Sequence, residues 1–271
     1  MKGDTGDSMT EPIVCVSFDG VTVDEILEEA ARANLAGADL VELRFDRLYL
    51  ISPPAEEIQE LRDQNEIIDE STWERRDLGD VNVDEIISTL KDGIAMPVIF
   101  TCRGESEGGY YPGDEKSRLK VLESAIESGV TWVDLELSIA TKQRAKMVSK
   151  ARDSEVKIIA SVHGLDGVPD AEKIVDLVKE NSESGDVVKC CYLTLDYQQS
   201  LAIIDAADSL KDEEIKCSIM GLGPGGDWTR IHAPLLNQAI VYTTLRTDFK
   251  LYEEGMINVK DVHDAWLLLE Y

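Results

Sequence analysis

Strand-like and helical segments alternate along almost the whole chain. Short apolar runs, typical of strands that are buried on both faces, are each followed by a stretch with helical spacing. Eight such strand–helix units succeed one another within 271 residues. Eight parallel strands, each followed by a helix, can close into a barrel, so the pattern predicts an α/β fold, the eight-stranded parallel (β/α)8 or TIM barrel. A doubly wound open sheet is the alternative architecture.

The predicted elements cover most of the sequence. The strands are predicted at 13–18, 40–45, 97–101, 132–137, 157–162, 187–193, 215–220 and 240–245. The helices are predicted at 23–36, 53–62, 83–91, 115–127, 140–151, 170–181, 197–210, 228–236 and 259–269. An acidic, irregular stretch fills 64–80, and no repeat or linker divides the chain. We therefore expect a flexible tail over 1–12 and a single catalytic barrel domain over 13–271.

The charge of the chain excludes one class of function. Acidic residues number 54 against 27 basic ones, which gives a net charge of −27. Proteins that bind nucleic acid carry a basic surface, so we expect no nucleic-acid partner. The acidic residues fall mainly on predicted helix faces and loops, which predicts a solvated acidic surface. Examples are Asp24-Glu25, Glu28-Glu29 and Asp212-Glu213-Glu214.

Compartment and redox state can also be inferred. No apolar run is long enough to span a membrane, and residues 1–8 lack the hydrophobic core of a signal peptide. We therefore expect a cytoplasmic protein with no membrane partner. The cysteines are odd in number, lack a CxxC pair and lie in strand-like runs, which favours buried reduced thiols over disulfides or a zinc site. They are Cys15, Cys102, Cys190, Cys191 and Cys217.

Ionisable residues recur near the ends of five consecutive predicted strands. They are Glu42, Arg44, Arg103, Asp134, Glu136, His163 and Lys189. Alternation along a strand places Glu42 and Arg44 on one face, and likewise Asp134 and Glu136. The active sites of parallel barrels lie at the carboxyl ends of the strands, so this distribution predicts a polar pocket at the barrel mouth.

Lys189 lies in the apolar run 187–193, which otherwise predicts a buried strand. Lysine is almost never fully buried unless it is paired. Burial disfavours the charged ammonium form, and a neutral amine condenses with ketones to form a Schiff base. A lysine that snorkels from the strand end, or that pairs with a carboxylate in the core, is the alternative interpretation.

Other residues of the predicted pocket suggest partners for this amine. His163, one strand–helix unit upstream of Lys189, is a natural general acid or base near neutral pH. Arg44, Arg103 and Arg230 suggest a carboxylate or phosphate in the ligand. Each arginine could instead pair with the acidic residues of the same strand ends.

Residues 221–226 match the spacing G-x-G-x-x-G. That pattern binds dinucleotides only between a strand and a helix of a dinucleotide-binding half. Here it lies late in the chain and contains Pro224. We expect instead a flexible loop over the pocket that offers backbone N–H groups to an anion.

Taken in order, these segments resemble the type I 3-dehydroquinate dehydratases of the shikimate pathway, from about Ile13 to the C-terminus. The motifs are Glu42-Leu43-Arg44-Phe45-Asp46, Thr101-Cys102-Arg103 followed by Glu107-Gly108-Gly109, Asp134-Leu135-Glu136, Ser161-Val162-His163, Val187-Val188-Lys189, Met220-Gly221 and Thr229-Arg230-Ile231. Each motif is short, but their order and spacing together are specific.

The resemblance implies a Schiff-base dehydration of 3-dehydroquinate to 3-dehydroshikimate in aromatic amino-acid biosynthesis. Lys189 would attack the ketone, His163 would transfer the proton, and Glu107 would orient His163. The implied substrate ligands are Glu42, Arg44, Arg103, Asp134 and Arg230. No metal or other cofactor is implied, because the iminium is itself the electron sink. Dimers are common in the family, so a homodimer is a candidate assembly.

The resemblance weakens near the C-terminus. Asn237 and Gln238 stand where the family usually carries Gly-Ser, and Tyr252 and Met256 replace the serine and glutamine of its lid. The stretch 64–80 resembles an insertion. Lid closure and substrate affinity are the properties that these departures would change.

Two other functions remain open on these residues. A class I aldolase-like enzyme would also carry a Schiff-base lysine on its sixth strand. A non-catalytic barrel that binds a carboxylate ligand would use the arginines and leave the lysine unreacted. Trapping of a ketone adduct and formation of a conjugated enone would separate the three.

Overall fold

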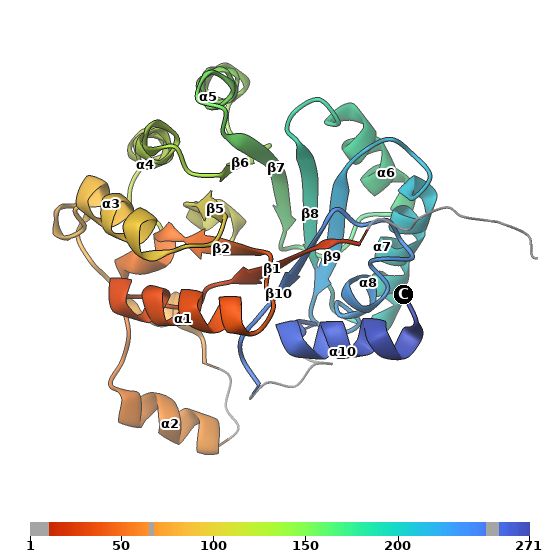
Figure 1. Ribbon diagram of the computed structural model, residues 1–271, viewed down its shortest axis with the longest axis horizontal. Coiled ribbons are helices and arrows are strands. Elements are labelled where there is room, and N and C mark those ends of the chain that lie inside the picture. Colours follow the sequence, from red (N-terminus) through yellow and green to blue (C-terminus); the bar gives the residue numbers. More distant parts are fainter. Residues whose placement is uncertain (1–10, 65–67, 248–254) are drawn as a thin grey trace, which may run out of the picture.

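The structure is a computed structural model that describes residues 11–64, 68–247 and 255–271. Its parallel strands form one eight-stranded sheet in the order β10-β1-β2-β5-β6-β7-β8-β9 (Figure 1). They are β1 (Ile13–Ser17), β2 (Leu40–Arg44), β5 (Val98–Thr101), β6 (Trp132–Glu136), β7 (Lys157–Gly164), β8 (Val187–Leu193), β9 (Cys217–Leu222) and β10 (Ile240–Thr243). The predicted TIM barrel is confirmed, and the open sheet is excluded by its closure.

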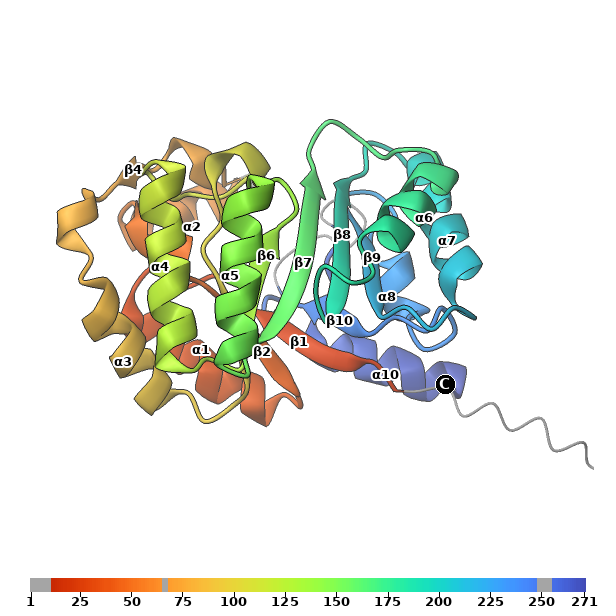
Figure 2. The ribbon, with the colours of Figure 1, turned by 90° about the horizontal axis from the view of Figure 1, so that it is seen from above.

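Helices surround the sheet, as Figure 1 and Figure 2 show from two directions. They are α1 (Val23–Leu35), α3 (Val83–Gly93), α4 (Glu115–Ser128), α5 (Thr141–Asp153), α6 (Ala171–Glu180), α7 (Tyr197–Leu210), α8 (Trp228–Ile231) and α10 (Val259–Leu269). A further helix, α2 (Ala55–Asp63), stands apart from this ring (Figure 1).

The barrel closes between β9 and β10 with the help of side chains. The N–H of Ala239 donates to the carbonyl of Cys217 at 2.8 Å. The amide oxygen of Gln238 accepts from the N–H of Ile219 at 2.6 Å, and the hydroxyl of Ser218 accepts from the N–H of Ile240 at 2.9 Å. We call this junction between β9 and β10 the barrel seam. At the seam, side-chain acceptors bind backbone N–H groups that main-chain pairing between the two strands leaves free.

Local sequence explains why the elements form where they do. The hydroxyl of Thr22 and the carboxylate of Glu25 form a capping box at the start of α1, which satisfies free backbone N–H groups. Ile26, Ala30 and Ala33 repeat at helical spacing and are buried against the sheet. The barrel interior is filled by a separate apolar cluster that includes Cys15, Leu40, Ile99, Trp132, Ile159, Val187, Cys191 and Tyr242.

Two predicted segments differ from the structure. The helix predicted at 228–236 is only α8, because Pro234 has no N–H to continue the helical bonding. The described part of 64–80 contains two 3₁₀ turns and the strand β4 (Glu74–Arg75), which pairs with β3 (Leu50–Ile51). Most of the predicted tail, residues 1–10, lies outside the described residues.

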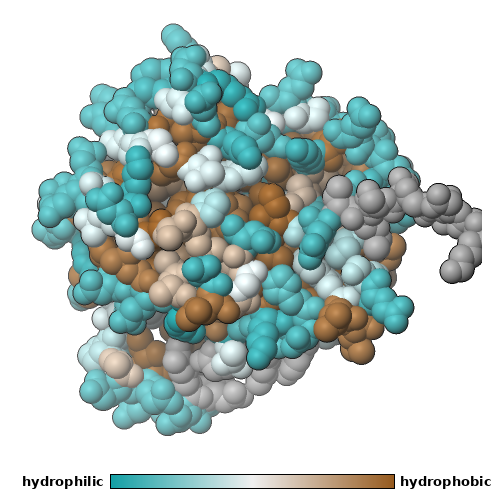
Figure 3. Space-filling model, viewed as in Figure 1, coloured by the Kyte–Doolittle hydropathy of each residue, from teal (hydrophilic) through white to brown (hydrophobic). Residues whose placement is uncertain are grey.

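The surface matches the expected charge distribution with one exception. Asp24, Glu25 and Glu28 are exposed on α1, and Figure 3 shows hydrophilic residues over the helical periphery of one face. Glu29 is instead half-buried, because its carboxylate accepts from the backbone N–H groups of Asp19 and Gly20 at 3.1 and 3.0 Å, and burial raises its pKa to about 7. All five cysteines are buried and free, as predicted. Within the described ranges, no helix is long and apolar enough to cross a membrane.

Candidate active site

One connected set of contacts joins six of the eight predicted site residues at the carboxyl end of the barrel. It runs through Glu42, Lys189, Asp134, Arg103, His163 and Glu107. The register explains part of this convergence, because Ser161 of β7 stands beside Glu136 of β6 and Lys189 of β8. Arg44 and Arg230 have other partners, described below.

Lys189 is buried, with 3% of its surface exposed. Its Nζ lies 3.1 Å from Oε1 of Glu42 and 3.8 Å from Oδ2 of Asp134. Below the amine, the ring centroid of Tyr242 lies at 3.8 Å. The strand is apolar in sequence, as predicted, but its lysine amine faces two carboxylates and an aromatic ring. Pairing with a core carboxylate, foreseen as an alternative interpretation of Lys189, is therefore observed.

Glu42 is held as an anion by its neighbours. Its Oε1 accepts from the hydroxyl of Thr101 at 3.1 Å, and Ser17 donates to its other oxygen. Burial alone would raise the pKa of Glu42, but the positive charges of Lys189, Arg103 and Arg44 hold it well below its usual range. Glu42 can therefore neutralise a cation on Lys189 but is a poor acceptor of its proton.

His163 lies between Glu107 and Arg103. Its Nδ1 is 2.9 Å from Oε2 of Glu107, whose other oxygen accepts from Ser138. The same Oε2 accepts from the N–H of His163 at 3.1 Å. These two bonds to Glu107 fix the plane of the imidazole.

The contacts also define the tautomer of His163. Nη1 of Arg103 lies 2.6 Å from Nε2, and a guanidinium can only donate. Nε2 therefore accepts, and the proton resides on Nδ1 and points at Glu107. Burial and the charges of Arg103, Lys189 and Arg44 hold the pKa of His163 well below its usual value. The imidazole is thus neutral, with its basic nitrogen turned towards the lysine side of the pocket.

Arg103 connects the histidine to the lysine. Its Nη2 donates to Oδ2 of Asp134 at 2.9 Å, the same oxygen that lies near Lys189. Its Nε lies 4.0 Å from Oε1 of Glu136 and has no hydrogen-bond partner among the described residues. The remaining oxygen of Asp134 accepts from Ser161. Pairing with acidic residues, foreseen as an alternative for the arginines, is thus observed for Arg103.

Arg44 pairs with a different acid from those expected. Its Nε and Nη2 donate to the two oxygens of Asp46 at 3.0 and 2.7 Å, and not to Glu42. Asp46 also accepts from the N–H groups of Arg103 and Tyr110, both at 3.1 Å. Asp46 therefore ties the end of β2 to the loop after β5, and Arg44 is held at the edge of the pocket.

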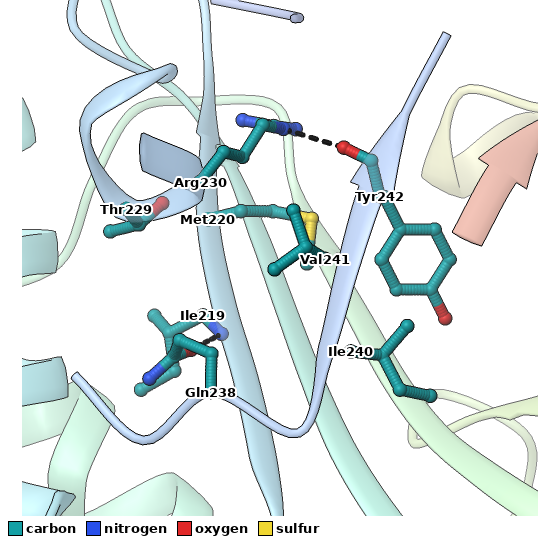
Figure 4. Close-up of a pocket in the computed structure, with 8 residues that line it drawn as sticks. All are labelled: Ile219, Met220, Thr229, Arg230, Gln238, Ile240, Val241 and Tyr242. Atoms are coloured by element: carbon teal, nitrogen blue, oxygen red, sulfur yellow. Dashed lines mark hydrogen bonds between the residues drawn. The ribbon is translucent and has the colours of Figure 1, made fainter. Parts of the chain in front are cut away.

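Arg230 is bound by backbone carbonyls. Its guanidinium donates to the carbonyl of Tyr242 at 2.8 Å, as Figure 4 shows. It also donates to the carbonyls of Gly221 at 2.7 Å and Gly255 at 2.9 Å. Nη2 also lies 3.4 Å from Sδ of Met256. Among the described residues it forms no ion pair with a carboxylate, although only 2% of its surface is exposed. A buried cation held by neutral oxygens is suited to accept an anionic ligand.

The glycine-rich loop plays a different part from the one expected. The N–H of Gly226 donates to the carbonyl of Gly223, and the N–H of Trp228 donates to the carbonyl of Gly225. These two groups are therefore occupied within the loop, and its carbonyls face Arg230. Of the lid departures, Met256 contacts Arg230, whereas Tyr252 lies outside the described residues.

Two side chains of the site are not among the predicted site residues. Tyr242 lies within a predicted strand, and its position on β10 places it in the barrel interior. Ser138, which donates to Glu107, lies two residues after the end of β6. A polar residue just after a strand in a barrel was the available signal for Ser138. Among the described residues, no group of three or more His, Cys, Asp or Glu could hold a metal ion.

A cavity of about 340 Å³ lies on the far side of Glu107. It is lined by Gly104, Ser106, Glu107, Glu115, Arg118, Glu136, Ser138, Ala140 and Gln143. Arg118 donates to both oxygens of Glu136 and to the carbonyl of Cys102. Arg118 therefore links Glu136, at the end of β6, to Cys102, which follows β5, beside the segment that carries Glu107.

Comparison with known proteins gives a consistent result. The family model of the type I 3-dehydroquinase matches residues 14–270. The 3-dehydroquinate dehydratase of Methanothermobacter thermautotrophicus is 30% identical over 232 residues, which cover 86% of this chain and 87% of the relative. That of Methanosarcina mazei is 25% identical over 231 residues, 84% of each chain.

Solved structures share the fold. The type I 3-dehydroquinate dehydratase of Clostridium difficile, with covalently modified comenic acid, superposes with a TM-score of 0.75 at 21% identity, over 95% of this chain and 92% of that one. The 3-dehydroquinate dehydratase of Geobacillus kaustophilus gives a TM-score of 0.72 at 22% identity, over 96% and 92%.

Proposed function

This chain belongs to the type I 3-dehydroquinase family, and we propose that it dehydrates 3-dehydroquinate through an iminium on Lys189. The reaction is that of a hydro-lyase in the shikimate pathway. The observation that carries the proposal is the unbroken set of contacts from Glu42 through Lys189, Asp134 and Arg103 to His163. These contacts support a nucleophilic role for the amine of Lys189 and a role as base for the neutral imidazole of His163.

In the first step the ammonium of Lys189 gives up one proton, and the resulting free amine attacks the ketone carbon. That proton and a second one lost from the nitrogen leave with the carbonyl oxygen as water, so the nitrogen ends as a positively charged iminium. Glu42, which stays ionised, and Asp134 lie close enough to stabilise that charge. The iminium acidifies the C–H of the adjacent carbon.

In the second step His163 acts as base and then as acid. Nε2 removes the proton of the adjacent carbon, and the electron pair forms an enamine. The enamine expels the hydroxyl one carbon further on, which takes the proton from Nε2 and leaves as water. Glu107 accepts from Nδ1 throughout and stabilises the transient imidazolium. Hydrolysis of the remaining imine frees Lys189 and 3-dehydroshikimate.

The arginines recognise the substrate in this proposal. Arg230 would bind the carboxylate, because it is a buried cation among carbonyl acceptors. Arg103 would leave Nε2 and contact a ring hydroxyl once the substrate enters. Glu42, Arg44 and Asp134 would contact the remaining hydroxyls.

Borohydride reduction in the presence of 3-dehydroquinate tests the proposal. We expect a stable mass increase on Lys189 and, without reductant, ultraviolet absorbance of the conjugated enone. Lys189→Ala should lose both while remaining folded. Lys157→Ala is the matched control, since its ammonium also lies over an aromatic ring, that of Trp132, but at the amino end of β7.

The result also separates the alternatives. An adduct without enone would indicate an aldolase-like enzyme, and neither signal would indicate a non-catalytic carboxylate-binding barrel. Enone without an adduct on Lys189 would assign the nucleophile elsewhere. The cytoplasmic location and the homodimer remain expectations, the second of which light scattering would test.

A further inference from the structure

Tyr242 stands beside two of the cations of the site, Lys189 and Arg230. Its ring centroid is 3.8 Å from Nζ of Lys189, and its carbonyl accepts from Nε of Arg230 at 2.8 Å. Figure 4 shows the carbonyl directed at Arg230 and the ring extending along β10 towards Ile240. One residue of the barrel seam therefore contacts both the amine and the carboxylate-binding arginine.

The contact with Lys189 is made by the face of the ring. The hydroxyl of Tyr242 is buried and has no hydrogen-bond partner among the described residues. Burial, with the nearby acidic groups Glu42, Cys15 and Asp134, raises the pKa of the phenol well above its usual value, so the ring is uncharged. Neither hydrogen bonding nor phenolate charge explains its position beside the amine.

The surroundings make such a contact effective. Tyr242 is 3% exposed and belongs to the apolar cluster that fills the barrel, so water does not compete for the ring face. A cation over an aromatic face is stabilised by the ring quadrupole, more strongly when desolvated. The carboxylates of Glu42 and Asp134 also contact Nζ and leave the ring as a third, uncharged neighbour.

We propose that Tyr242 is a positioning residue for the Schiff-base step. The face of its ring contacts the Lys189 cation and holds the amine nitrogen in position. The inference rests on the proposed function and adds a residue to it. Condensation of an ammonium with a ketone yields an iminium and one water, so the positive charge stays on the same nitrogen. The ring therefore holds that nitrogen in place before and after the covalent bond forms.

The test weakens the attraction between the ring face and the cation while it keeps an aromatic ring of similar size at position 242. Tyr242 is replaced by phenylalanine and then by mono-, di- and trifluorinated phenylalanine, each of which withdraws more electron density. The rate of borohydride trapping with 3-dehydroquinate is measured against pH. Because the cation loses stabilisation, the pH of half-maximal trapping should fall stepwise, by about 0.7 unit across the series if the contact is worth about 1 kcal/mol.

The same series at Phe100 is the matched control. Phe100 is buried on β5 and packs against Phe45, away from the amine. No trend is expected there. A flat profile at Tyr242, or equal trends at both positions, would overturn the role of Tyr242 while leaving the wild-type adduct intact. If the wild-type protein forms no adduct on Lys189, the proposed function itself is wrong, and the inference falls with it.

Discussion

Nη1 of Arg103 lies 2.6 Å from Nε2 of His163, so the nitrogen proposed to act as base contacts a cation. Both side chains are buried, and Arg103 is anchored on its other side by Asp134. The contact keeps the imidazole neutral and the correct tautomer populated until a ligand displaces the guanidinium.

Arg103→Met should raise the pKa of His163 towards its usual value, because one of the charges that lower it is removed. The sign follows from the folded state. The wild-type imidazole stays neutral until the pH is well below 6.5, whereas the variant imidazole should protonate at higher pH. Proton NMR titration of the three histidines measures this directly. Arg152→Met, on the exposed end of α5, is the control, and an unchanged His163 titration would argue against the capping contact.

His163→Ala should separate imine formation from elimination. Attack by Lys189 needs little from the imidazole, whereas proton removal needs a positioned base. Turnover should fall about a hundredfold to ten-thousandfold, while the borohydride adduct on Lys189 still forms. Stopped-flow absorbance and mass spectrometry give the two rates. Near-normal turnover would mean that another group is the base.

Met256→Gln should lower the KM for 3-dehydroquinate. Sδ of Met256 is a weak acceptor 3.4 Å from Arg230, and it has no hydrogen to donate to a substrate. A glutamine can accept from Arg230 and donate to the carboxylate at once. Steady-state kinetics measure the effect. An unchanged or higher KM would show that this chain holds its substrate in another way.

Gln238→Leu should destabilise the barrel seam. It would leave the N–H of Ile219 and the carbonyl of Leu236 without their side-chain partners in a buried place. Each such loss costs about 1–3 kcal/mol in the free energy of unfolding. Urea unfolding measures it, with Gln198→Leu on the exposed face of α7 as the control. Equal stability of the two variants would show that the seam does not depend on Gln238.

Salt should affect stability and substrate binding in opposite directions. With a net charge of −27 the surface repels itself at low salt, and the Debye length shrinks from about 10 Å at 0.1 M to about 3 Å at 1 M. The Tm should therefore climb towards molar salt, as calorimetry would show. The KM should rise or stay level, because salt also screens the attraction of arginines for a carboxylate. A Tm indifferent to salt would mean that local pairing already balances the acidic residues.

Several features of the site could be predicted from local pattern alone. Side-chain alternation is a steric property of each strand, so the shared face of Glu42 and Arg44 follows from their spacing. The carboxyl ends of parallel strands meet at one mouth of the barrel, so the positions of Lys189 and His163 on their strands predict that the two side chains lie close together. Helical periodicity likewise placed Asp24, Glu25 and Glu28 in solvent, whereas the half-buried carboxylate of Glu29 is held by the N–H groups of Asp19 and Gly20.

Tertiary structure decided the partners. Glu42 and Lys189 are 147 residues apart, and Glu107 and His163 are 56 apart, so their contacts depend on strand order and register. Arg44 pairs with Asp46 and not with Glu42, and Arg230 donates to backbone carbonyls and not to carboxylates. Both outcomes depend on the conformation of the loops that follow the strands. The ring of Tyr242 meets Lys189 only because the barrel closes at β10. The periodicity of the sequence determines which face of a strand or helix a side chain occupies. Only the closed barrel determines which side chains from distant segments contact it.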